Sequence, residues 1–124
     1  MEKSMDNKRR EQLEAIETLS EYNERVVKNI PILIRELSGK RLDDTDKFQS
    51  SILSAINWEI QVLNATLEVI NENMEKISKE EFNDSVVNLN RALETHDDSR
   101  LVESFEGILN ELKKLDKAIK ETLV

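Results

Sequence analysis

Apolar residues between Leu53 and Ile77 recur in two interleaved series with a seven-residue period. One series is Leu53, Ile60, Leu67 and Met74, and the other is Ile56, Leu63, Ile70 and Ile77. Alternating steps of three and four residues place both series on one face of an α-helix, as in the seam of a helical bundle or coiled coil. The pattern predicts a long helix that follows residues 40–46 and ends at about Lys76.

The same spacing predicts three further helices. The first spans about Asp6 to Ser38 and stops at Gly39, which suits the left-handed position after a helix. Pro31 lies inside it, so we expect either a kink there or a break with Asn29 capping a short second piece. The third helix begins at the capping box formed by Ser78 and Glu81, and the fourth carries apolar residues from Leu101 to Leu123.

Two glycines and one proline in 124 residues leave few tight turns, which disfavours a sheet. The fold class predicted is all-α: one domain, residues 1–124, forming an antiparallel up-down-up-down four-helix bundle with a long first hairpin and shorter third and fourth helices. Residues 1–12 offer only Met1 and Met5 to a core and are expected to fray. Because the third helix is short, a second copy is expected to cover the excess of the long hairpin in a homodimer.

The net charge of −8 is spread over the whole chain, since four consecutive segments are each acidic. This disfavours nucleic acid and anionic membranes as partners. The one basic cluster, Lys8-Arg9-Arg10, is flanked by acidic residues and is interpreted as a solvated, salt-bridged helix face. No apolar run approaches the ~20 residues of a membrane span, and no secretory signal is recognisable. The expected location is cytoplasmic.

Motifs for metal binding and catalysis are not found. Asp43, Asp44 and Asp46 are interpreted as helix caps, because a calcium loop opened by Asp44 would have Gln49 in place of its glycine. His96 is the only histidine, so a bundle di-iron site with two Glu-x-x-His pairs is excluded. Without cysteine, a nucleophile elbow or a glycine-rich loop, we expect no catalytic residues, no metal site, no cofactor and no enzyme activity.

The long second helix carries another apolar arc, roughly opposite its heptad seam. Its members are Ala55, Trp58, Val62, Ala65 and Val69. Either this helix is the most buried one, contacted on two flanks, or the arc is a partner-binding or self-association surface anchored by Trp58. Asn57, Asn64 and Asn71 also repeat by heptad, and they are either solvated or pair across an interface.

In size, charge, lack of cysteine and helix count the chain resembles the small helical proteins that serve bacteria as flagellar or type III export chaperones. The run from Ile52 to Ile70 carries the amphipathic pattern that such proteins use to cradle a partner helix. The resemblance implies binding of an amphipathic helix from an export substrate. We therefore predict a non-enzymatic, chaperone- or adaptor-like interaction module with an apolar groove, and the alternative is a structural homo-oligomer without a separate ligand.

Overall fold

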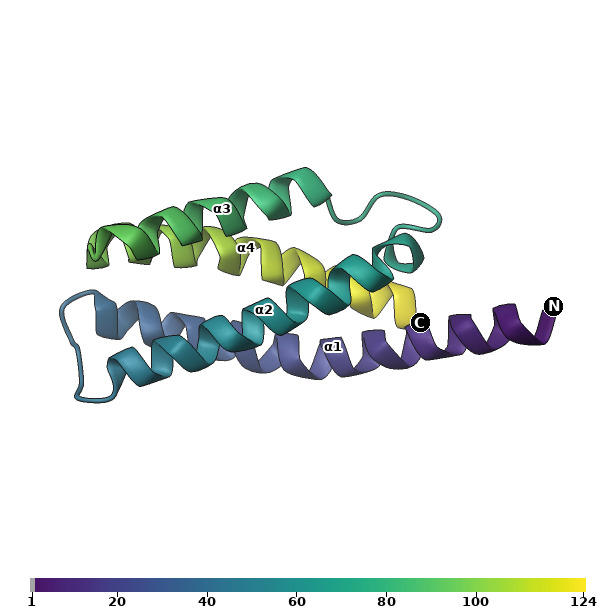
Figure 1. The fold of residues 1–124 in the computed structure, drawn as a ribbon, viewed down its shortest axis with the longest axis horizontal. Coiled ribbons are helices and arrows are strands. Elements are labelled where there is room, and N and C mark those ends of the chain that lie inside the picture. Colours follow the sequence, from purple (N-terminus) through teal and green to yellow (C-terminus); the bar gives the residue numbers. More distant parts are fainter. Residues whose placement is uncertain (1) are drawn as a thin grey trace.

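The computed structural model describes the backbone of residues 2–124 and the side chains of residues 7–124. It contains four α-helices, α1 (Glu2–Leu37), α2 (Thr45–Ile70), α3 (Lys79–Thr95) and α4 (Asp98–Leu123). Successive helices run antiparallel, as Figure 1 shows, so the predicted all-α, up-down-up-down bundle is confirmed. The fraying predicted for residues 1–12 lies partly outside the described residues and stays a prediction.

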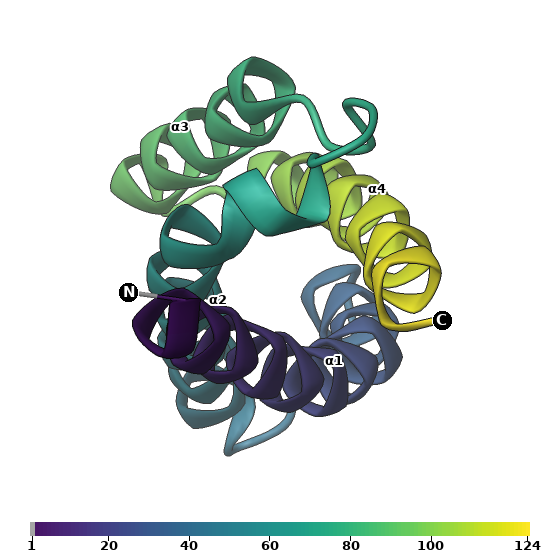
Figure 2. The ribbon, with the colours of Figure 1, turned by 90° about the vertical axis from the view of Figure 1, so that its right-hand side faces the viewer.

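The helices form two hairpins that pack through α1 and α4. Helix α1 packs along both α2 and α4, α3 packs only on α4, and α2 touches α4 over a short stretch. Among the described residues, no Cα atom of α2 lies within 8 Å of a Cα atom of α3. Figures 1 and 2 show α1 beneath α4, with α2 crossing obliquely from the level of α1 toward that of α4 at its C-terminal end. The bundle is therefore open along the α2–α3 side.

The core follows the apolar stripes predicted from the sequence. Phe105 and Ile108 of α4 are fully buried, as are Ile30 of α1 and Ile56 of α2. Each fully buried Ile, Leu or Phe side chain contributes about 1.5–3 kcal/mol relative to an exposed one. Since α4 contacts every other helix, its stripe forms the centre of this core.

Helix α1 continues through Pro31 to Leu37, so the alternative of a break with Asn29 as a cap is wrong. Pro31 lies on the exposed side, where water can reach the carbonyl group that loses its donor. The predicted stop is confirmed, because Gly39 adopts a φ of 106° directly after the helix.

Helix α2 ends at Ile70, earlier than the predicted end at about Lys76. The Asn71 side chain ends it: its Oδ1 accepts from the backbone nitrogens of Lys76 (2.9 Å) and Ile77 (3.1 Å), and its Nδ2 donates to the Ile77 carbonyl oxygen (3.0 Å). Met74, predicted to continue the seam, is 66% exposed in this loop. Asn71 is therefore a loop-forming residue and not one that pairs across an interface.

Helices α3 and α4 begin as predicted. Ser78 accepts a hydrogen bond from the Glu81 backbone nitrogen at 3.2 Å, which confirms that half of the capping box. Asp97 accepts from the Ser99 nitrogen at 2.9 Å, and His96 supplies a left-handed turn residue (φ 55°) between the helices. Helix α3 is short as predicted, with 17 residues against 36 in α1, but α4 has 26 residues, as many as α2, so the prediction of a shorter fourth helix is wrong. Figure 1 shows the N-terminal end of α1 projecting beyond the C-terminus of α4.

Candidate interaction surfaces

The Trp58 arc of α2 lies along α1. The Trp58 and Tyr22 ring centroids are 4.4 Å apart with a tilt of 35°, and the Arg25 guanidinium carbon lies 5.8 Å from the centroid of Tyr22. Ala55, Trp58 and Val62 are half-buried against the core, and Val69 is buried. The geometry matches the interpretation in which α2 is contacted on two flanks.

Ala65 is the one exposed member of the predicted partner-binding set. Its carbonyl oxygen accepts a hydrogen bond from Gln12 Nε2 at 3.4 Å, so this end of the arc also faces α1. The five residues therefore lie together on one flank of α2, and most of them already contact other residues of this chain. Their role in binding a partner stays a prediction.

The heptad seam of α2 divides into two rows. Ile56, Leu63 and Ile70 are buried in the core, whereas Leu53, Ile60 and Leu67 are only half-buried. The half-buried row turns toward the open α2–α3 side, because Ile60 and Leu67 line a narrow notch there together with Ile77 and Phe82. The notch has a volume of about 10 Å³, which is room for about one water molecule. The seven-residue period of the sequence identified both rows, but it did not indicate that a notch lies beside the half-buried row.

Uncharged amides flank this notch on both helices. Asn64 of α2 and Asn83 of α3 belong to its lining. Asn57 and Asn90 stand one heptad away on the same sides of their helices, and all four side chains are exposed. The exposed Lys79 of α3 also belongs to the lining, so one lysine stands among the amides on this side.

Two polar side chains are fully buried inside the bundle. Asn23 donates from Nδ2 to the Leu112 carbonyl oxygen (2.9 Å), but its Oδ1 has no hydrogen-bond partner in the described part of the chain. Glu59 is 0% exposed, neither of its carboxyl oxygens has a partner among the described residues, and burial raises its pKa to about 8. On a helical wheel Glu59 lies with Thr66 and Asn73 on a thin polar strip between the two apolar arcs, which predicts an exposed carboxylate, and the structure buries Glu59 instead. Glu59 occupies the step between Ile56 and Leu63 in the buried row, a signal present in the sequence.

The two ends of the bundle are each fastened by an arginine. Arg41, in the α1–α2 loop, makes two hydrogen bonds to Asp98 at the start of α4 (2.7 and 2.9 Å) and one to Asp46 (2.7 Å). These carboxylates raise the pKa of Arg41, and Arg41 lowers the pKa of Asp98. At the other end, Arg9 makes two 2.8 Å hydrogen bonds to Glu72, lowering the pKa of that carboxyl group. The basic cluster therefore includes a long-range ion pair.

The start of α2 differs from its prediction. Asp44 occupies the cap position, but its side chain makes no capping hydrogen bond. The buried Thr45 hydroxyl accepts from the Leu42 backbone nitrogen (2.8 Å) and donates to Glu36 Oε1 (2.7 Å). A threonine side chain thus fastens the loop, because it can act as donor and acceptor at once.

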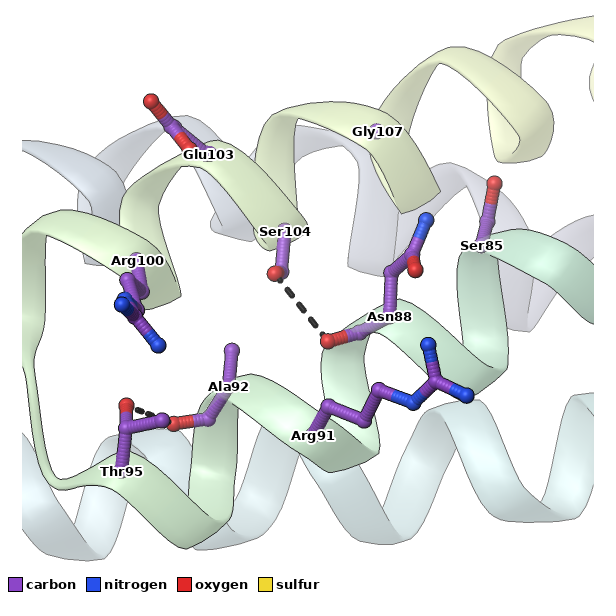
Figure 3. Close-up of a pocket in the computed structure, with 9 residues that line it drawn as sticks. All are labelled: Ser85, Asn88, Arg91, Ala92, Thr95, Arg100, Glu103, Ser104 and Gly107. Atoms are coloured by element: carbon purple, nitrogen blue, oxygen red, sulfur yellow. Dashed lines mark hydrogen bonds between the residues drawn. The ribbon is translucent and has the colours of Figure 1, made fainter.

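A shallow polar depression of about 370 Å³ lies between α3 and α4. Figure 3 shows Arg91 and Arg100 extending beside it, Glu103 turned away from α3, and Ser104 Oγ donating to the Asn88 carbonyl oxygen, a bond of 3.3 Å. In residues 7–124, no group of three His, Cys, Asp or Glu side chains is close enough to hold a metal ion. Within the same residues, no helix has both the length and the apolar character needed to cross a lipid bilayer.

These features define a small helical-bundle protein whose distinctive surface is apolar and bordered by amides. The chain belongs to the family described as a domain of unknown function, DUF8042, whose model matches residues 14–118. The match covers parts of all four helices and the three connections between them. No match is found among curated proteins or among solved structures.

Proposed function

We propose that this protein is a non-enzymatic interaction module that binds an amphipathic helix of another protein along its α2–α3 side. The observation that carries the proposal is the wide spacing of α2 and α3, with no Cα pair of these two described helices within 8 Å, beside half-buried Leu53, Ile60 and Leu67. Helices in direct contact have axes about 8–10 Å apart. Because no Cα atoms of α2 and α3 come within 8 Å of one another among the described residues, the half-buried row of α2 is available to another helix.

A helix suits this side better than an extended peptide. The half-buried row repeats every seven residues, the spacing that receives anchors at i, i+3, i+4 and i+7 of a partner helix. Val86 and Leu93 of α3 are half-buried and supply a second apolar row. The asparagines favour a partner helix whose flanks carry amide or hydroxyl groups, and Lys79, which also lines the notch, favours an acidic residue beside it.

The proposal places the partner beside the Trp58 arc and not on it, since α1 already covers much of that arc. In other respects it follows the resemblance to export chaperones: an adaptor- or chaperone-like, cytoplasmic bacterial protein without cofactor. The evenly acidic surface supports a protein partner over nucleic acid or an anionic membrane.

A structural homodimer is the second candidate. It is favoured by the N-terminal end of α1, which extends past the bundle in Figure 1 and could pack against another copy. In this case the same apolar row is covered by a second chain, and no separate ligand is needed.

Photo-cross-linking distinguishes the two candidates. A photoreactive phenylalanine analogue replaces Asn64 on the α2–α3 side, and the matched control carries it at Ser54, which is exposed elsewhere on α2. Cross-linked peptides from a helical segment of another protein, at position 64 only, would support the interaction module. Covalent dimers of this chain, separated by their doubled mass from monomers with an internal cross-link, would identify the homodimer. Equal labelling from both positions would contradict the α2–α3 side as a binding surface.

A further inference from the structure

The buried Glu59 and Asn23 lie at one level of the bundle. Trp58 stacks on Tyr22, and Glu59 and Asn23 directly follow these two residues on α2 and α1. Asn23 also bonds to the Leu112 carbonyl oxygen, which places α4 at the same level. Among the described residues, this level therefore holds three buried oxygens without a donor: both carboxyl oxygens of Glu59 and Oδ1 of Asn23.

Within residues 7–124, no charged group compensates for a Glu59 carboxylate at this level. Burial alone raises the pKa of the Glu59 carboxyl group. The charged residue nearest to it along α2, Glu68, is exposed. On α1, the charged residues of the neighbouring turns are exposed: Glu21, Glu24 and Arg25. On α4, the acidic residues nearest this level have lysine partners, Glu111 with Lys114 (3.3 Å) and Asp116 with Lys120 (2.9 Å).

A proton on Glu59 removes the buried charge and reduces the number of unmatched acceptors. A protonated carboxyl group carries one O–H donor, and Asn23 Oδ1 is a buried acceptor at the same level that lacks one. An ionised carboxylate adds a charge to a site without a donor, and burying such a charge costs several kcal/mol. The charge is relieved only when water reaches the carboxylate.

Helix α2 is the element that can let water in. Among the described residues its Cα atoms stay more than 8 Å from those of α3 and approach α4 only over a short stretch, so α1 and two exposed arginine ion pairs hold most of it. Swinging α2 away from α4 would hydrate Glu59 while leaving the α1–α4 and α3–α4 contacts intact. The same movement would widen the side bordered by Leu53, Ile60 and Leu67.

We propose that Glu59 is a proton switch that controls the opening of α2: protonated, it keeps α2 closed on the core, and ionised, it favours a state in which α2 has moved out and the apolar row is exposed. The inference is independent of the identity of any partner. It concerns an equilibrium of the chain alone and holds or fails whether or not a helix binds at the α2–α3 side.

Hydrogen exchange of the full chain at a series of pH values tests the switch, with rates divided by those of an unstructured chain. The opening constants of α2 amides are expected to rise about tenfold per pH unit from about pH 5 and to level off near pH 8, because the group titrates at about 8 when closed and at an ordinary value when open. Core amides of α4 should have smaller opening constants at every pH.

Two variants and one direct titration complete the test. Glu59→Gln should abolish the pH dependence of α2 opening, and the control Glu68→Gln, an exposed position on the same helix, should retain it. In wild type, the ¹³C signal of the Glu59 carboxyl group should titrate at least two pH units above the exposed glutamates. The switch is overturned by an ordinary Glu59 titration, by equal opening constants in α2 and α4, or by a pH dependence that survives in Glu59→Gln. If Glu59→Gln does not fold, the two wild-type measurements decide.

Discussion

Trp58 of α2 stacks against Tyr22 of α1, with ring centroids 4.4 Å apart, and thereby sets the register of the first hairpin. We expect Trp58→Ala to lower the free energy of unfolding by about 2–3 kcal/mol, below the usual cost for a fully buried aromatic because Trp58 is only half-buried. Denaturant unfolding followed by circular dichroism measures the change. Trp58→Phe, which keeps an aromatic ring, should cost less than half as much, and equal losses in both variants would contradict the stacking contribution.

Glu59 makes stability depend on pH in the opposite sense to an ordinary salt-bridged carboxylate. Its pKa is about 8 in the folded chain and about 4.5 when unfolded, so the folded state holds the extra proton between these values. The free energy of unfolding therefore falls as pH rises through this window, by up to about 4 kcal/mol between pH 5 and pH 8. Urea titrations at several pH values should show this decline in wild type and in Glu68→Gln, but not in Glu59→Gln. A wild-type stability that rises across this range would contradict the assignment.

Asn71 forms the loop after α2 through three hydrogen bonds to the backbone of Lys76 and Ile77. Asn71→Ala leaves two backbone donors and one acceptor without their partner and should cost about 2 kcal/mol. Asn73→Ala, at an exposed position in the same loop, serves as the control and should change stability by less than about 0.5 kcal/mol. Thermal unfolding measures both variants, and similar midpoints for the two would show that Asn71 does not hold the loop.

The Arg41–Asp98 pair links the α1–α2 loop to α4 but lies at the surface, with 39% and 35% of the two side chains exposed. A double-mutant cycle with Arg41→Ala and Asp98→Ala should give a coupling energy of about 1 kcal/mol or less. The pKa of Asp98 is lowered in the folded chain, so this contribution is present above its unfolded value of about 3.8 and is lost as pH falls further. Coupling that does not weaken in 1 M salt would contradict a surface ion pair.

The number and order of the helices were predictable because the spacing of apolar residues indicates where each helix lies along the chain. The end of α2 was not, because the seven-residue period continues formally to Ile77 while a side chain, Asn71, diverts the backbone after Ile70. The spacing of apolar residues indicates the extent of one helix at a time. A capping loop depends instead on contacts made by residues that follow no such spacing.

The surfaces were predictable only in part for a related reason. A helical wheel locates the Trp58 arc and the heptad seam, but it does not say which neighbour covers each. The structure assigns the arc largely to α1 and leaves Leu53, Ile60 and Leu67 half-buried on the open side. Glu59 was misplaced because a charged residue type was given more weight than its position between two buried steps.

The two glycines provide a matched pair for the last prediction. Gly107 lies within α4, and a Cβ atom added there meets no other atom within 4 Å, so Gly107→Ala should raise the free energy of unfolding by about 0.5–1 kcal/mol through the higher helix propensity of alanine. Gly39 also has free space around it, but its φ of 106° is strained for any side chain, so Gly39→Ala should lower stability by about 1 kcal/mol or more. Denaturant midpoints of the two variants should shift in opposite directions. A destabilising Gly107→Ala would contradict the helix-propensity argument and would indicate that the depression between α3 and α4, which Gly107 lines, does not tolerate a methyl group.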